Sequence, residues 1–254
     1  MIGGRNIFSS IPPVTKNLII INFIVWLAML VIPVRMFDFM RYGALHYITA
    51  PDFNPIQLVT YMFMHSTTNF AHILFNMFTL FMFGITLERV LGGPKFLFYY
   101  LSCGIGAALV QEAVWALTWE GDAVKALANL YNVDYPEMRD AIQRVMAGEP
   151  IGNIRENISA FQNYMLTIGA SGAVYGVLLA FGMIFPNREL YMMFIPIPVK
   201  AKWMVIGYGL IELLIGLSSP GSTVAHFAHL GGMIFGFIMI WYWKKKGIIN
   251  GGYY

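Results

Sequence analysis

The chain has 254 residues, of which 58% are hydrophobic and only 11% are charged, with a formal net charge of +3. Soluble domains usually carry about 25% charged residues, and about a quarter of the surface of an unfolded chain of this size stays in water after folding. The composition therefore excludes an ordinary soluble domain and indicates a protein covered by lipid. The single cysteine, Cys103, excludes an internal disulfide. The sequence also lacks the long run of basic residues that is typical of a nucleic-acid-binding protein.

Six apolar stretches approach the length of about 20 residues that a membrane-spanning helix needs. They cover residues 18–34, 72–91, 96–119, 168–185, 190–217 and 227–243. We therefore expect an all-α, polytopic membrane protein in which residues 1–254 form a single domain with six transmembrane helices.

Two connections between these stretches are long. Residues 35–71 contain apolar segments that are too short to cross a bilayer, which favours an interfacial or re-entrant segment. Residues 120–163 alternate acidic and basic side chains, and they predict an extracytoplasmic insert between the third and fourth helices, with a helix near 135–146. The sequence does not reveal the role of this insert.

The basic residues predict the orientation in the membrane. With six spans, ten of the 16 Lys and Arg residues fall on the side of the termini, and Lys244–Lys246 directly follow the last apolar stretch. Cytoplasmic loops are enriched in Lys and Arg, so both termini are expected in the cytoplasm. The six-span core suggests a bacterial inner membrane.

Polar residues within membrane spans are costly and mark functional sites by default. The first pair is His72 and Asn76, whose spacing of four residues places both side chains on one helix face. Each can donate a hydrogen bond without carrying charge. A hydrogen bond between two helices is the alternative explanation.

The second polar site is Ser171, which lies in the segment Gly169-Ala-Ser-Gly172-Ala-Val-Tyr175. Small neighbours allow another helix or a peptide backbone to approach the serine closely. The pattern is not the nucleophile elbow of soluble hydrolases, because no strand precedes it. A seam of small residues between packed helices remains the alternative.

The third polar site is His229, at the start of the last apolar stretch, with Gly232 and Gly236 on the same helix face. That face can press against the small residues around Ser171, although interfacial histidines at a helix start are also common. His72, Ser171 and His229 all begin their spans from the same side of the membrane. A serine, a histidine base and neutral donors are the parts of an acyl-transfer site.

No carboxylate accompanies His229 in the sequence, so we expect a Ser171–His229 dyad without an acidic partner. Tyr175, one turn after Ser171, is expected to hold the imidazole by ring packing. Glu88 is expected to brace a loop at the opposite end of the second span. Glu212, within the fifth stretch, is the feature that best favours a transporter, while lipid snorkelling or a Ser or His partner is the other explanation for it. The histidines do not have the spacing of a zinc site, so neither a metal nor a cofactor is expected.

Taken in order, the motifs resemble those of the rhomboid family of intramembrane serine proteases. The matching segments are His72–Asn76 (H-x-x-x-N), Glu88–Gly92 (E-x-x-x-G), Gly169–Tyr175 (G-x-S-G-x-x-Y) and Ala228–Gly236 (A-H-x-x-G-x-x-x-G). The resemblance extends over residues 17–243.

The resemblance implies Ser171 as nucleophile, His229 as general base and acid, and an oxyanion hole formed by His72, Asn76 and the Ser171 backbone N–H. It further implies that Tyr175 stacks on His229, and that Gly232 and Gly236 form the tight contact between the fourth and sixth spans. Gly169 and Gly172 are further supporting residues of the site. His65 is expected to be structural, and the role of His226 is not readable.

The function that this resemblance implies is cleavage of transmembrane segments, with transmembrane proteins as substrates and the bilayer as environment. A catalytically inactive scaffold or chaperone of the same family is one alternative, although such proteins usually lose the Ser or the His. A transporter is another. The natural substrate and the oligomeric state are not readable from the sequence.

Overall fold

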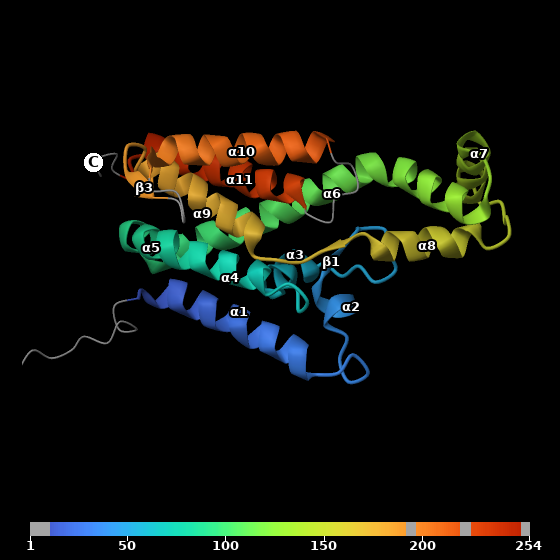
Figure 1. Cartoon of the computed structure of the whole chain (residues 1–254), viewed down its shortest axis with the longest axis horizontal. Helices are drawn as coiled ribbons and strands as arrows, with labels where there is room; N and C mark the ends of the chain where they lie inside the picture. The colour runs from blue at the N-terminus through green and yellow to red at the C-terminus, as the bar shows by residue number, and fades with distance from the viewer. Residues whose placement is uncertain (1–10, 192–196, 219–224, 250–254) are drawn as a thin grey trace, which may run out of the picture.

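The computed structural model of the chain describes residues 11–191, 197–218 and 225–249. Its long helices lie side by side in a bundle, and one of them continues past the bundle toward a smaller helical projection (Figure 1). Within these described residues, four helical segments are long and apolar enough to cross a membrane: Pro13–Val31, Phe70–Leu91, Gly93–Tyr131 and Ala201–Ser218. The expectation of an all-α, polytopic membrane protein is confirmed, whereas the count of six spans stays a prediction.

The first two spans are tied together at one end of the bundle. α1 (Pro13–Val31) starts with proline in its first turn, where a missing N–H costs nothing, but its N-cap residue makes no side-chain hydrogen bond. Glu88 of α5 (Ile85–Leu91) supplies the cap instead. Its carboxylate accepts from Val14 N at 2.9 Å, from Thr15 N at 2.7 Å and from Thr15 Oγ1 at 2.8 Å. Glu88 thus braces the start of helix α1, whereas the expected partner was a loop.

The second span is interrupted in its middle. α4 (Phe70–Thr79) begins at Asn69, whose side chain accepts from Ala71 N. A π-helical turn, η3 (Leu80–Gly84), follows before α5 resumes and ends at Gly92, whose φ of 78° favours glycine. The π turn rephases the helix, so that the two halves of the span present separately chosen faces to their neighbours.

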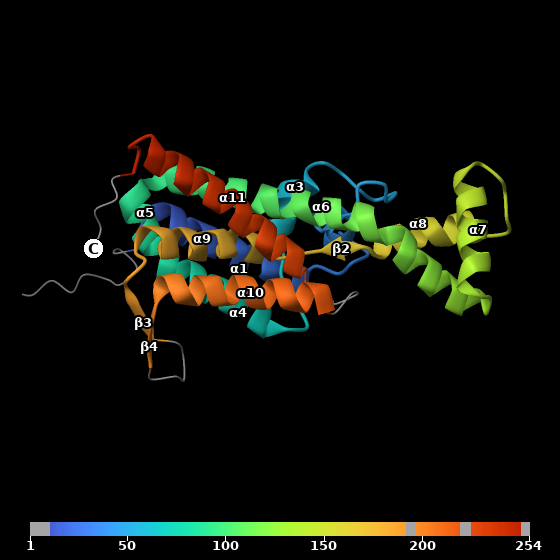
Figure 2. The same cartoon turned by 90° about the horizontal axis from the view of Figure 1, so that it is seen from above.

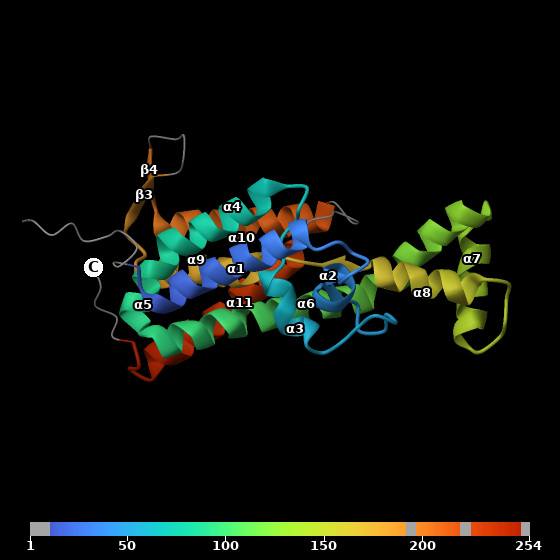
Figure 3. The same cartoon turned by 90° about the horizontal axis from the view of Figure 1, so that it is seen from below.

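The third helix, α6 (Gly93–Tyr131), is 39 residues long and continues well beyond the expected end at residue 119. Four residues of its extension, Ala123, Val124, Leu127 and Ala128, are buried against α7 (Tyr135–Met146) and α8 (Ile154–Tyr164). The expected helix over 135–146 is confirmed, and the insert has an apolar cluster of its own. Figures 2 and 3 show the end of α6 extending away from the bundle together with α7 and α8.

The last three helices follow the insert. They are α9 (Ser171–Ile184), α10 (Ala201–Ser218) and α11 (His226–Lys245). The expected span over 190–217 starts too early, because Glu189–Tyr191 (β3) pairs with Pro198–Lys200 (β4) as a short hairpin before α10. Pro198 lacks the N–H that a helix interior needs, which is consistent with extended backbone there. Residues 192–196 of that expected span lie outside the described residues.

Small residues let α6, α9 and α11 approach one another closely. A Cβ added at Gly232 of α11 would collide with the backbone carbonyl of Gly172 in α9. A Cβ at Gly176 would lie 2.5 Å from Cys103 Sγ of α6. Gly236, in contrast, faces Tyr99 and Cys103 of α6. The expected contact between the fourth and sixth spans therefore rests on Gly232, and the expectation for Gly236 is corrected: it admits α6 instead.

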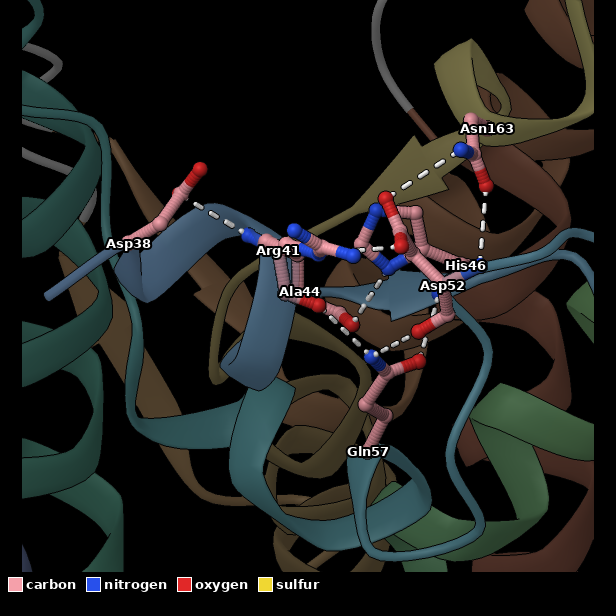
Figure 4. A network of polar contacts seen from close by, with 7 residues as sticks. All are labelled: Asp38, Arg41, Ala44, His46, Asp52, Gln57 and Asn163. Atoms are coloured by element: carbon pink, nitrogen blue, oxygen red, sulfur yellow. Dashed lines mark hydrogen bonds and ion pairs between the residues drawn. The ribbon is translucent and has the colours of Figure 1, made fainter. Parts of the chain in front are cut away.

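The loop between the first two spans is folded by polar contacts (Figure 4). Its elements are α2 (Phe39–Gly43), β1 (Leu45–His46), α3 (Gln57–Thr60) and the 3-10 turn η2 (Tyr61–Phe63), and β1 pairs with β2 (Leu166–Thr167) next to α9. The fully buried Gln57 donates to Arg41 O and Asp52 O and accepts from His46 N. Asp52 also exchanges two hydrogen bonds with Asn163 of α8. These hydrogen bonds hold the loop in a defined conformation beside the start of α9.

Candidate active site

Ser171 is the first residue of α9 and is partly buried. The backbone before it is held by the 3-10 turn η2, because Gly169 N donates to Tyr61 O at 2.9 Å. Gly169 has a φ of 131°, a conformation that L side chains rarely adopt. The first N–H groups of a helix have no partner within it, so the start of α9 at Ser171 offers backbone donors and the positive end of the helix dipole.

His229 of α11 lies beside this serine. Its Nε2 is 2.8 Å from Ser171 Oγ, and the histidine is 8% exposed. The Tyr175 ring lies flat on the imidazole, with ring centroids 4.3 Å apart and an interplanar angle of 5°. The structure therefore brings Ser171, Tyr175 and His229 together as the motifs predicted. The close approach of Gly172 and Gly232, each near one of the paired residues, sets the distance between the two helices.

His72 faces the same site from α4. A Cβ placed on Gly169 would lie 2.7 Å from His72 Nε2 and 3.6 Å from Ser171 Oγ, so the imidazole and the hydroxyl flank this glycine. The other ring nitrogen, Nδ1, accepts from Ser66 N at 3.3 Å. Neutral histidine has one donor and one acceptor nitrogen, so this bond leaves the proton on Nε2, on the side of Ser171.

Asn76, one turn further along α4, is 7% exposed and donates from Nδ2 to His72 O at 2.7 Å. This bond uses one of its two amide hydrogens. Asn76 is therefore anchored to the helix that carries His72, with one N–H left to donate elsewhere.

His65 buttresses this arrangement from the folded loop. It is completely buried, packs against the His72 ring with centroids 5.0 Å apart, and its Nε2 lies 3.5 Å from Ala170 N. Burial lowers the pKa of the His65 imidazole to about 3. His65 thus stays neutral in the folded protein, because its buried position disfavours the charged imidazolium.

Because of His65, stability is expected to depend on pH. The folded pKa is depressed below the value of 6.5 for an unperturbed histidine, so unfolding takes up a proton at acidic pH. This contribution to stability is complete above pH 6.5 and is lost as the pH falls toward 3, by up to about 1.4 kcal/mol per pH unit. Thermal unfolding in detergent micelles at pH 7 and pH 5 measures it. His65→Asn should reduce this pH dependence, and an unchanged slope in His65→Asn would contradict the assignment.

Glu212 of α10 is a candidate functional residue that the sequence motifs did not place near Ser171. The expected absence of a carboxylate beside His229 is wrong: Glu212 Oε2 lies 3.1 Å from His229 Nδ1. The same oxygen accepts from His226 Nδ1 at 2.6 Å, and Oε1 accepts from the Tyr175 hydroxyl. The contact was missed because 17 residues and two different helices separate Glu212 from His229. The signal that could have found it was an acidic residue in a span, next to a motif rich in histidine.

The same cluster also has the residue types of a metal site. Among the described residues, Glu212, His226 and His229 offer ligand atoms that all lie within 4.8 Å of one another. Two ligands of a tetrahedral zinc site with bonds of about 2.0–2.1 Å lie about 3.3 Å apart. The 2.6 Å between His226 Nδ1 and Glu212 Oε2 is shorter than that and matches a shared proton. The geometry fits hydrogen bonds better than metal ligation.

Comparison with known proteins places the chain in a family. The family model described as the rhomboid domain matches residues 52–123 and 145–246, and it leaves out the end of α6 and most of α7. "Rhomboid protein 1, mitochondrial" from Saccharomyces cerevisiae is 25% identical over 190 residues, which are 75% of this chain and 42% of the yeast protein. The chain thus spans less than half the length of this relative. Since the domain covers most of the chain, the chain belongs to the rhomboid family.

Proposed function

We propose that this integral membrane protein is an intramembrane serine endopeptidase that cleaves transmembrane segments of other proteins. The observation that carries the proposal is the 2.8 Å contact between Ser171 Oγ and His229 Nε2 within the helix bundle. A nucleophilic hydroxyl within hydrogen-bond reach of an imidazole is the arrangement that activates serine for acyl transfer. Membership in a family known for such proteases supports it.

In this proposal Ser171 attacks the carbonyl carbon of the scissile peptide bond. His229 takes the hydroxyl proton on Nε2 and then delivers it to the leaving amine, which departs with one half of the substrate. A water molecule, deprotonated by the same histidine, then hydrolyses the acyl-enzyme and regenerates Ser171.

The negative charge that develops on the carbonyl oxygen requires donors placed in advance. His72 carries its proton on the nitrogen that faces Ser171, and α9, whose first backbone N–H groups have no partner within the helix, starts at Ser171. Asn76 retains one amide hydrogen for this purpose. Together with the Ser171 N–H they form the proposed oxyanion hole.

The substrate class follows from the place of the site in a membrane bundle. A helix hides its own amides within its hydrogen bonds, so only a segment that unwinds easily exposes a bond to Ser171. Transmembrane proteins with glycine or proline near the cleavage point are therefore the proposed substrates. The bacterial inner membrane stays a prediction from the six-span core, and the cytoplasmic termini stay a prediction from the basic residues. The yeast relative bears a mitochondrial name.

An inactive family member acting as a scaffold is the competing function. In such a protein the serine and histidine need not stay paired, yet here both are present and in contact. The transporter alternative loses its main argument, because the buried Glu212 has three partners at the Ser171 site, namely Tyr175, His226 and His229.

Cleavage in reconstituted liposomes tests the proposal. The purified protein is mixed with a single-span protein whose helix carries Gly-Pro near one end, and the products are mapped by mass spectrometry. We expect one cut within the membrane segment by the wild type and none by Ser171→Ala. Cleavage that persists in Ser171→Ala at the wild-type rate, or an intact substrate with folded wild type across a panel of helices, would refute it.

A further inference from the structure

Glu212 is an acidic residue on a helix that is otherwise largely exposed. α10 buries only Ala201, Val205 and Glu212, and the last two are seven residues apart on one face. Glu212 is 7% exposed, whereas its neighbours Ile211 and Leu213 are 52% and 40% exposed. A carboxylate at membrane depth is costly unless it is well paired, so its inward position requires compensating donors.

Three side chains from two other helices supply that compensation. Oε1 accepts from the hydroxyl of Tyr175 on α9. Oε2 accepts from His226 Nδ1 on α11 at 2.6 Å, a short, strong contact that fixes the position of this oxygen. The same Oε2 lies 3.1 Å from His229 Nδ1, but the ring N–H does not point along the line to it. Two anchors therefore hold the carboxylate at the back of the imidazole that contacts Ser171.

The proposed reaction makes two demands on His229. Its Nε2 must carry the lone pair that accepts the Ser171 proton, which requires the remaining proton on Nδ1. The imidazolium that forms must then be stabilised until the proton is passed on. A carboxylate beside Nδ1 meets both demands, since it favours the N–H on that side and attracts the positive charge.

We propose that Glu212, held by His226 and Tyr175, is a positioning residue that completes a Ser171–His229–Glu212 triad. This inference rests on the proposed function and adds to it a third residue contributed by α10. Because the contact to neutral His229 is poorly aligned, most of its strength arises when the ring becomes charged. Interactions that strengthen in the transition state raise kcat and leave substrate binding largely unchanged.

Tyr175 has two roles in this cluster. Its ring stacks on His229 and fixes the plane of the imidazole, while its hydroxyl fixes Glu212. Tyr175→Phe separates these roles, because it keeps the ring and deletes only the hydroxyl. Two variants isolate the hydrogen bond of His226 in a similar way, since His226→Asn retains a short N–H donor and His226→Phe does not.

The test is steady-state cleavage of a transmembrane substrate in liposomes by wild type, Glu212→Gln and Glu212→Asp. Glutamine keeps the shape of the side chain but loses the charge. A wrongly held histidine costs about 10⁴ in kcat in a well-aligned triad, so we expect a fall of about 100-fold for this weaker contact. The KM should change by less than about threefold, and Glu212→Asp should recover part of kcat.

Variants of Tyr175 and His226, the two residues that anchor Glu212, test the same inference indirectly. We expect Tyr175→Phe and His226→Phe each to lower kcat several-fold, and His226→Asn to recover activity. If Glu212→Gln keeps wild-type kcat, or loses activity only in proportion to a lower melting temperature, Glu212 is a helix anchor and the inference is wrong. Loss of wild-type activity on treatment with a metal chelator would likewise overturn it in favour of a metal site.

These outcomes are distinguishable from a failure of the proposed function. An inactive wild type, with no product that depends on Ser171, would refute the protease itself. An active wild type with a fully active Glu212→Gln variant would refute only the triad.

Discussion

Replacing His229 with alanine is expected to lower kcat for cleavage of a transmembrane substrate by about 10⁴-fold or more. Without the imidazole at 2.8 Å, no base near Ser171 Oγ can take its proton, and the hydroxyl is a weak nucleophile. The remaining rate should come from substrate binding and the oxyanion donors alone. The change is measured as kcat in liposomes of defined composition.

Ser171 and His229 are also expected to have non-additive effects on kcat. The Ser171→Ala and His229→Ala double variant should be no slower than the slower single variant, because the two residues act as one unit. Phe237→Ala is the control on the same helix, since Phe237 is 51% exposed and should leave kcat unchanged. A His229→Ala protein that retains more than a tenth of wild-type kcat would contradict the assigned base.

Gly232→Ala is expected to produce the largest loss of stability. Its new Cβ would meet the carbonyl oxygen, carbonyl carbon and Cα of Gly172, and backbone atoms cannot turn away as a side chain does. Separating α9 from α11 to make room should cost about 3 kcal/mol of the free energy of unfolding. It should also pull Ser171 and His229 apart, so the folded fraction should lose activity.

Gly207→Ala on α10 provides the matched control, because a Cβ there meets nothing within 4 Å. Alanine favours a helix over glycine, so this variant should be as stable as the wild type or slightly more so. Chemical unfolding of both variants in mixed micelles measures the difference. Overpacking normally costs more than about 0.5 kcal/mol. A Gly232→Ala protein whose free energy of unfolding lies within that margin of the wild-type value would show that the two helices can separate freely.

The helical bundle was largely predictable because lipid imposes one strong rule on the sequence. Apolar stretches of sufficient length must be helices, and the charged patterning of 135–146 marked an amphipathic helix, as α7 shows. The boundaries that failed were set by tertiary contacts. α6 extends to Tyr131 because α7 and α8 cover its apolar face, and α10 starts at Ala201 because a hairpin precedes it.

In the candidate site, too, the residues in local motifs were predictable and the contacts between distant helices were not. Ser171, Tyr175 and His229 were predictable because each sits in a local motif of small and polar residues. Glu212 could be recognised as unusual in a span, but its contact with His229 depends on how α10 packs against α9 and α11. Gly236 was assigned to the wrong neighbour for the same reason, since helix periodicity gives a face and not the helix that fills it.

Labelling with a fluorophosphonate probe tests the central claim most directly, because the probe reacts with an activated serine whatever the natural substrate is. Wild type, Ser171→Ala and His229→Ala would be compared in micelles, each with its melting temperature measured to establish folding. The account predicts labelling of the wild type alone, at a single site that peptide mapping assigns to Ser171. Folded wild type that takes up no probe, or Ser171→Ala labelled as strongly as wild type, would contradict it.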